Sequence, residues 1–387
     1  MDYRTLKILN RRILAGQCLS RRISGPGAVV RVAEACCGLN SQDYLESFSS
    51  FWARVGRFQD SDLTSEFGPK RGLVRIRTVR GTMHTIPSRD YWIHLFGSPG
   101  YRRFLSNYDR IAKRRGIGDR EFRVRSLYEP LIDHLSGRAI TANEVTQFIV
   151  DRLKHHGIRS KMKLHRGWSS QATVGPSWTG IGEMSNLGLI VSAGRKGSET
   201  LWASTEDWLK TEKKPPNPEE CYVDLIRKYI ENYGPVTRDD IVYWTFLLTK
   251  DVDSAIESLK EDLTVENFGT RQEFFSIHGK PKVSGEPPEV IILPEFDSLL
   301  MGHKDKSRYL DPRHLKKVFW GLGGIHRTVL LDGFVGATWK RKKTREGMNV
   351  EVTPLRGLTV GEKSLIESGF DDYSRYVGLE GSVLFKK

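Results

Sequence analysis

The spacing of apolar side chains in the first third of the chain predicts three helices followed by a β-hairpin. Apolar residues recur every three or four positions over 3–15, 29–38 and 43–57, as on the buried face of a helix. From 73 to 79 apolar and basic residues alternate, and 82–86 is a suitable return strand. Three helices followed by a hairpin are typical of a winged helix-turn-helix domain.

The same pattern recurs in the next part of the chain. Thr141 and Glu144 have the spacing of a capping box in front of an apolar helix. Further on, strands at 189–192 and 199–202 flank the basic, glycine-containing segment 193–198, which we expect to be a wing.

A third unit of this kind is predicted over 219–278. Apolar residues at helical spacing over 222–230 predict its first helix, and Thr237 is a suitable cap for the second, with Asp240 three residues later. Alternating residues at 274–277 indicate a strand.

From residue 289 onward the sequence favours strands. Two short apolar runs, 290–293 and 328–331, precede Asp332 and Gly333, a dipeptide that strongly favours a hairpin turn. Strands at 334–339 and 349–353 would continue a small sheet or barrel, with a helix near 360–378.

These patterns favour an α+β fold of tandem winged helix-turn-helix units followed by a C-terminal small sheet or barrel. A chain of 387 residues has room for two to four domains at roughly 100–200 residues each. The expected boundaries are 1–118, 119–213, 214–282 and 283–387.

The charge of the chain favours a polyanionic partner. The formal net charge is +14, which suits nucleic acid or an anionic surface, although it could also serve solubility alone. No stretch of 18 apolar residues is present, and the first residues lack the apolar core of a signal peptide. We expect a cytoplasmic, nucleoid-associated protein that does not bind membranes.

The sequence predicts neither a metal nor a cofactor. Cys18, Cys36, Cys37 and Cys221 lack zinc-ligand spacing and are expected to be reduced and buried. The phosphate-binding, dinucleotide-binding, zinc-protease and serine-hydrolase motifs are all missing from the sequence.

Five segments, in order along the chain, resemble the AlkZ/YcaQ-type winged-helix DNA glycosylase family. They are Leu39–Asp43, Arg80–His84, Gly234–Asp240, Leu293–Gly302 and Asp332–Trp339. The resemblance implies an α+β fold of three tandem winged helix-turn-helix domains and a C-terminal β-rich, barrel-like domain. It also implies a glycosylase that holds duplex DNA and excises alkylated bases. Leu39–Asp43, the signature segment, matches the catalytic motif of the family, except that Asn40 stands where the family has glutamine.

The resemblance implies that Asn40 and Gln42 are the catalytic residues. Cleavage of a glycosidic bond passes through a cationic sugar that water attacks, and a carboxamide can hold that water or donate to a sugar or phosphate oxygen. We expect Gln42 to hold the water and Asn40 to assist. Asn40 and Gln42 could instead be ordinary residues of a turn. Asp43 is then expected to be a favourable negative charge at a helix N-terminus.

DNA contacts are expected from basic and polar residues on three hairpins. The candidates are Arg80, Thr82 and His84 on the first, Arg195 and Lys196 on the second, and Lys340 and Arg341 near the C-terminus. Each set could equally be a solvated charged strand or turn, with His84 partly buried in the first.

The resulting hypothesis is a monofunctional, monomeric glycosylase without an obligate protein partner, acting on N7- or N3-alkylated purines in duplex DNA. No lysine adjoins the signature segment, so we expect hydrolysis to an abasic site. The reaction could extend to unhooking interstrand crosslinks. The alternatives are a non-catalytic winged-helix regulator or lesion binder, and a resistance protein for one bulky alkylating natural product.

Overall fold

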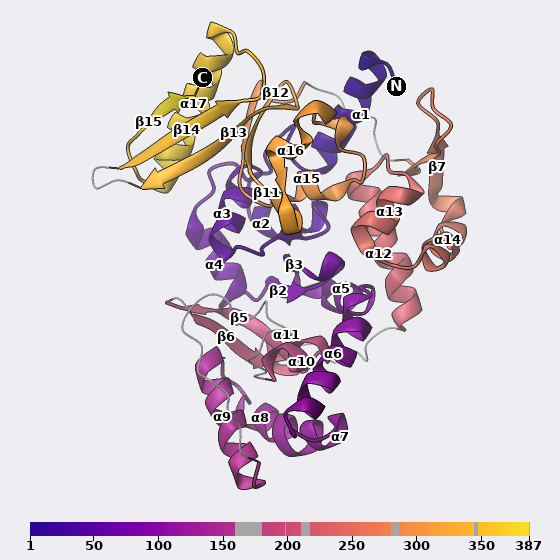
Figure 1. Cartoon of the computed structure of the whole chain (residues 1–387), viewed down its shortest axis with the longest axis vertical. Coiled ribbons are helices and arrows are strands. Elements are labelled where there is room, and N and C mark those ends of the chain that lie inside the picture. Colours follow the sequence, from indigo (N-terminus) through magenta and orange to yellow (C-terminus); the bar gives the residue numbers. More distant parts are fainter. Residues whose placement is uncertain (159–179, 198, 210–216, 280–285, 344–346, 387) are drawn as a thin grey trace. The chain divides into compact units, whose positions relative to one another are not determined.

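The computed structural model describes residues 1–158, 180–197, 199–209, 217–279, 286–343 and 347–386. They form two compact units, here called the first unit (Met1–Leu63 with Val223–Lys387) and the second unit (Thr64–Tyr222). Helices and sheets occur in both units, so the predicted mixed α+β fold is confirmed (Figure 1).

The first unit opens with helices close to the predicted ones. They are α1 (Tyr3–Gly16), α2 (Ala28–Ala35) and α3 (Tyr44–Trp52). A fourth helix that the sequence pattern did not predict, α4 (Asp60–Phe67), follows and ends in the second unit. A two-residue extended segment, β1 (Leu39–Asn40), lies between α2 and α3. Leu9, Ile13 and Phe51 are fully buried, as the helical spacing of apolar residues predicts.

Three helices and a hairpin also lie where 219–278 predicts them. They are α12 (Pro218–Tyr233), α13 (Arg238–Thr245), α14 (Thr249–Ser258), β7 (Leu263–Glu266) and β8 (Phe274–Ile277). Thr237 and Asp240 form the capping box of α13. Between α12 and α13, Val236 pairs with Phe275, which ties the start of α13 to the hairpin.

The C-terminal strands form an open sheet with the order β15-β14-β13-β12-β9 (Figure 1). The strands are β9 (Val290–Leu293), β12 (Arg327–Leu331), β13 (Phe334–Lys343), β14 (Met348–Pro354) and β15 (Gly381–Phe385). Asp332 and Gly333 have φ values of 47° and 84°, as the predicted two-residue hairpin turn requires.

The expected barrel does not close among the strands that the structure describes. A barrel requires the first and last strands to pair, but β9 and β15 lie at opposite edges of the sheet. Helix α17 (Val360–Val377) packs against the sheet instead, and Phe370 meets Trp339 edge to face at 5.1 Å. A helix therefore supplies the core that a closed barrel would fill with strand side chains.

Short elements complete the first unit. They are α15 (Ser298–Gly302), α16 (Leu315–Val318), β10 (Phe319–Trp320) and β11 (Gly324–Ile325). The last two strands form a small hairpin in which Phe319 pairs with Ile325.

In the second unit, the first two predicted hairpins join in one sheet. Its strands are β2 (Leu73–Arg77), β3 (Met83–Pro87), β4 (Ile140–Thr141), β5 (Ile190–Lys196) and β6 (Glu199–Ser204). Antiparallel pairing of Arg75 with Ser192 links β2 to β5, and β6 pairs with both β5 and β4.

Helices supply the rest of the second unit's core. They are α5 (Tyr91–Phe96), α6 (Gly100–Arg114), α7 (Arg120–Arg123), α8 (Glu129–His134), α9 (Ala142–His155), α10 (Ile181–Asn186) and α11 (Thr205–Leu209). Thr141 and Glu144 form the predicted capping box of α9. Among the described helices of either unit, none is long and apolar enough to cross a membrane.

A buried ion pair holds the first unit together. The Arg54 guanidinium donates to both Asp297 carboxylate oxygens at 2.8 Å, and both side chains are fully buried. Arg54 also donates to the backbone oxygens of Gln17 and Ser50 at 3.0 Å. Burial by itself would lower the pKa of Arg54, but Asp297 reverses the shift, so the pKa is raised and Arg54 stays charged.

Removal of one partner of this pair should be severely destabilising. We expect Asp297→Ala to lower the free energy of unfolding by about 3–5 kcal/mol, because it leaves a buried guanidinium without its counter-ion. Urea denaturation followed by tryptophan fluorescence measures the change. Asp371→Ala, which removes an exposed carboxylate from α17, is the matched control, and equal losses for the two variants would contradict the assignment.

Candidate functional site

The signature segment is a tight turn that leads into α3. The Asn40 side-chain oxygen accepts the backbone N–H of Gln42 at 3.1 Å. Asp43 is the N-cap of α3, and its carboxylate accepts the backbone N–H groups of Leu45 and Glu46 at 2.9 and 3.2 Å. The structure therefore gives Asp43 a capping role, while Asn40 and Gln42 lie together in the turn.

The Asn40 amide nitrogen is a buried donor without a hydrogen-bond partner among the described residues. Asn40 is only 5% exposed, and Nδ2 is fully shielded from solvent. Because Oδ1 accepts from Gln42, the hydrogen-bond pattern assigns the NH2 group to the other position. A buried donor left unpaired costs about 1–3 kcal/mol, so this group is suited to meet an acceptor on a ligand. The Gln42 side chain is half-buried beside it.

The Leu293–Gly302 segment positions this turn from far along the chain. The backbone N–H of Asn40 donates to Ser298 Oγ at 2.8 Å. Ser298 follows Asp297, the residue that holds Arg54. Two of the five segments singled out in the sequence are thus joined in one buried hydrogen-bond network.

Glu46, which sequence reasoning missed, joins α3 to the C-terminal sheet. Its side chain is 4% exposed and accepts from Arg327 at 2.8 Å and from Arg341 at 2.7 Å. Its second oxygen accepts from the Arg327 Nε at 3.1 Å and the Glu295 backbone N–H at 3.3 Å. The available signal was a glutamate among the buried positions of α3.

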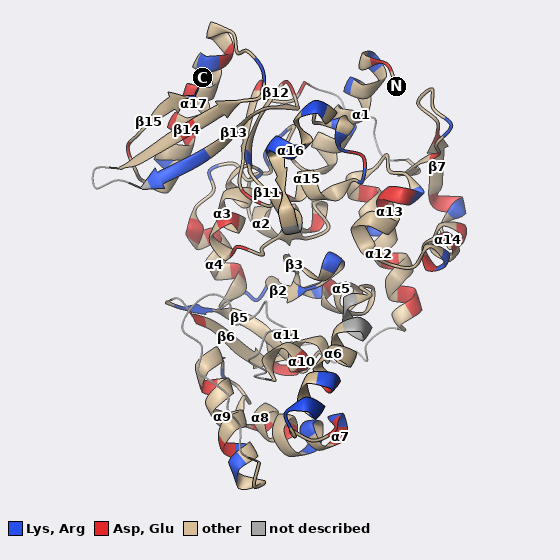
Figure 2. Cartoon of the chain, viewed as in Figure 1, with Lys and Arg blue, Asp and Glu red and all other residues tan. Residues whose placement is uncertain are grey.

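The basic residues of β13 point to different environments. Figure 2 shows the positive charge along the end of this strand. Lys340 is exposed, whereas Arg341 binds Glu46 and donates to the Tyr373 hydroxyl at 2.9 Å. Lys342 pairs with Glu351 at 2.7 Å. Lys340 is thus placed to meet a ligand, while Arg341 already has two partners.

The first hairpin of the second unit places its three candidates at one end of β2 and β3. Arg80 adopts a left-handed conformation with φ of 59°, and Arg80 and Thr82 are half-buried. His84 is 4% exposed. Burial, aided by the charge of Arg80 and opposed by a hydrogen bond to the Thr82 backbone oxygen, lowers the pKa of His84 to about 4. His84 is therefore neutral near pH 7 and does not offer a positive charge.

The second hairpin carries its candidates at the end of β5. The strands are longer than predicted, since β5 continues to Lys196, which pairs with Glu199 across the hairpin. Lys196 is exposed and Arg195 is half-buried. The two hairpins share one sheet, so the five candidates of the second unit belong to one β-structure.

An exposed aromatic residue on the β10–β11 hairpin is a further candidate. Trp320 is 48% exposed, and a Cβ added at Gly324 would lie 2.0 Å from its ring, so only glycine lets the indole lie against this strand. Lys316 and Lys317 are exposed on α16, immediately before the hairpin (Figure 2). The signal in the sequence was a tryptophan directly before a glycine-rich turn.

The described residues contain no group of three or more His, Cys, Asp or Glu side chains that could hold a metal ion. The four cysteines are free and buried, as the sequence predicts.

Comparison with known proteins gives consistent relatives. A family model described as "DNA glycosylase AlkZ-like" matches residues 33–376. The "Interstrand DNA cross-link repair glycosylase" of Streptomyces sahachiroi is 25% identical over 280 residues, which cover 69% of this chain and 70% of the relative. The solved structure of the Streptomyces sahachiroi DNA glycosylase AlkZ has a similar fold, with a TM-score of 0.74 at 20% identity over 98% of this chain and 99% of that one.

The low pKa of His84 has a measurable consequence. Between about pH 6.5 and pH 4 the unfolded chain binds a proton at this residue that the folded chain does not, so stability falls as the pH drops through this window. The effect is on the order of 3 kcal/mol for a pKa lowered from 6.5 to about 4. NMR of the imidazole should show no titration between pH 8 and pH 5; a midpoint near 6.5 would refute this environment.

Lys340 and Arg341 should respond differently to truncation. We expect Arg341→Ala to lower the free energy of unfolding by about 1–3 kcal/mol, because Glu46 and Tyr373 each lose a charged hydrogen-bond partner. Lys340→Ala should change it by no more than about 0.5 kcal/mol, since the side chain is exposed. Urea denaturation of the two neighbouring variants makes the comparison, and similar losses would show that the Glu46 network is not stabilising.

Proposed function

The chain belongs to the AlkZ-like DNA glycosylase family, and on this premise we propose that it hydrolyses the N-glycosidic bond of N7- or N3-alkylated purines in duplex DNA. The observation that supports this most directly is the signature turn, where Asn40 offers a buried, unpartnered NH2 group beside Gln42. Such an arrangement suits a reaction that needs a positioned water and a polar contact to the sugar.

The proposed reaction divides the work between the two carboxamides. An alkylated purine carries positive charge and leaves readily, so the site needs no strong acid. The Gln42 carbonyl accepts a hydrogen bond from the attacking water, and the Asn40 NH2 group donates to a sugar or phosphate oxygen. Water bonds to C1′ as the base departs; one proton is released, and the products are the free base and an abasic site.

We also propose the tandem winged-helix organisation with the boundaries 1–118, 119–213, 214–282 and 283–387. Its third domain is supported by α12, α13, α14 and the β7–β8 hairpin, with Val236 paired to Phe275. Its second is supported by β4 pairing with β6, the outer strand of the β5–β6 wing. A short strand paired to the wing is the expected winged-helix arrangement.

DNA contact in this proposal comes from the β2–β3, β5–β6 and β10–β11 hairpins and from β13. Helix α14 carries three carboxylates and one lysine, which disfavours its insertion into a groove. The residues better placed to meet phosphates are the exposed Lys340 and Lys196 and the half-buried Arg80, Thr82 and Arg195. Arg341 and the neutral His84 instead contribute to packing and hydrogen bonding within the protein. Trp320, with Lys316 and Lys317 beside it, has the character of an apolar wedge that enters a base stack.

The proposed substrate range includes interstrand crosslinks. An N7-linked crosslink joins two purine bases, and each base is attached to its own strand by a glycosidic bond of the kind cleaved here. Hydrolysis of one of these bonds releases one strand and so unhooks the crosslink. The Streptomyces relative is named for crosslink repair. The protein would act as a monomer on DNA in the cytoplasm. The departure at Asn40, one methylene shorter than glutamine, favours a lesion-binding protein without catalysis as the second candidate.

Substitution of the carboxamides tests the proposed enzyme. With duplex DNA containing one N7-methylguanine, we expect Gln42→Ala and Asn40→Ala each to lower the single-turnover rate of base release by about 10²–10³-fold, as for loss of one polar group at a developing charge. Mass spectrometry measures the free base, and anisotropy measures DNA affinity, which should change little.

The matched control is Gln272→Ala, which removes an exposed carboxamide of the first unit and should leave the rate unchanged. DNA binding without base release by the unmodified protein, even at stoichiometric concentration, would instead establish the lesion binder.

A further inference from the structure

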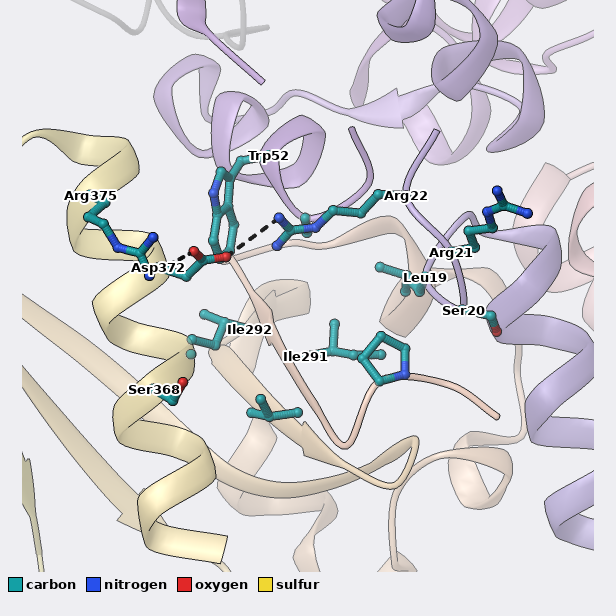
Figure 3. A pocket seen from close by; sticks show the side chains of 14 residues that line it. Leu19, Ser20, Arg21, Arg22, Trp52, Ile291, Ile292, Ser368, Asp372 and Arg375 are labelled. Atoms are coloured by element: carbon teal, nitrogen blue, oxygen red, sulfur yellow. Dashed lines mark ion pairs between the residues drawn. The ribbon is translucent and has the colours of Figure 1, made fainter. Parts of the chain in front are cut away.

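A cavity of about 470 Å³ lies in the first unit, apart from the signature segment (Figure 3). Its walls come from residues 19–22 after α1, the C-terminal end of α3, the edge strand β9 and helix α17. These four segments are distant in sequence, so the cavity is a product of the tertiary fold.

Positive charge prevails in this cavity. Among the described residues that line it, Asp372 supplies the single carboxylate, which pairs with two guanidinium groups: Arg375 at 3.2 Å and Arg22 at 3.7 Å. Figure 3 shows these two arginines directed at Asp372 from opposite sides, while Arg21 lies farther along the rim. Three cationic side chains and one anionic side chain leave an excess of two positive charges.

Arg22 is held in place but only partly compensated. Its guanidinium lies over the Trp52 ring at 4.7 Å, which fixes it against α3. Its side chain is 38% exposed, and Asp372 pairs with it only loosely at 3.7 Å, so Arg22 lacks the close pairing that a nearer anion would supply. A second anion near Arg22 would provide it.

The opposite wall is apolar. Leu19, Ile291, Ile292 and Pro288 line it, and Ser20 contributes a hydroxyl that is shielded from solvent and has no hydrogen-bond partner among the described residues. An anion attached to a less polar body, such as a phosphate attached to a sugar, could pair with the arginines and pack against the apolar wall. Guanidinium groups match the geometry of phosphate oxygens.

We propose that this cavity binds a phosphate group of the DNA strand that carries the lesion, away from the excision site. The inference rests on the proposed function. Helix α3 connects the two places: nine residues separate Asp43 from Trp52, which is about 14 Å along a helix. A DNA strand advances about 3.4 Å per nucleotide along its axis, so a strand that runs alongside α3 would place the contacted phosphate about four nucleotides from the lesion.

Two substitutions of opposite effect test the site in the full chain. Asp372→Asn removes the competing carboxylate and should tighten binding to duplex DNA about threefold at low salt. Arg21→Gln combined with Arg375→Gln should weaken binding about tenfold and lower the salt dependence by about one phosphate contact. Anisotropy at several salt concentrations measures both effects.

Matched controls separate the cavity from general charge effects. Asp371→Asn makes the same change one residue away on α17, at an exposed position, and Arg4→Gln removes an exposed arginine of α1. Both should alter DNA affinity less than the cavity variants, and thermal denaturation confirms that every variant is folded. Equal effects for cavity and control variants would overturn the proposal.

Two further measurements identify the source of the phosphate and distinguish failure of this proposal from failure of the proposed function. If the cavity variants change binding of inorganic phosphate or a nucleoside monophosphate but not of DNA, the DNA-strand proposal is wrong. Base release at saturating DNA should be unaffected by the variants. If the unmodified protein releases no base while the cavity variants still shift DNA affinity, the proposed reaction fails and the phosphate site stands.

Discussion

The buried ion pair between Arg54 and Asp297 is the interaction on which the first unit depends. It joins the end of α3 to the start of α15, and Arg54 also binds the backbone at Gln17 after α1. The next residue, Ser298, accepts the backbone N–H of Asn40. One short segment therefore stabilises the unit and fixes the entrance to the signature turn, so stability and the geometry of the candidate site cannot vary independently.

In the candidate site, the carboxylates are engaged in structural contacts, and the side chains proposed to act on the substrate are neutral. The carboxamides of Asn40 and Gln42 are neutral, and the two carboxylates at the start of α3 are already engaged: Asp43 caps the helix, and Glu46 binds Arg327 and Arg341. An alkylated purine is cationic while it is attached to the sugar and departs as a neutral base. In the proposed reaction, neutral groups that orient water suit a substrate that already carries the positive charge needed for bond cleavage.

Local features were predictable from the sequence, whereas long-range pairings were not. The capping boxes at Thr141 and Thr237 and the turn at Asp332 follow from residues at most three positions apart, and the structure confirms them. The partners of Glu46 lie 281 and 295 residues away, and no periodicity reveals them. For the same reason the packing of α17 against the open sheet, in place of a barrel, could not be predicted, and the burial of His84 was left open. The roles of Asn40 and Gln42 stay a prediction.

The most direct test of the central claim is to locate the signature turn on DNA. All four native cysteines are buried, so a Gln42→Cys variant offers one accessible thiol for disulfide crosslinking to duplexes that carry a thiol tether at defined nucleotides. We predict efficient crosslinking when the tether is at the lesion nucleotide and little when it is eight base pairs away. Equal crosslinking at both positions, or none at the lesion, would contradict the assignment of this turn as the place where the base is excised.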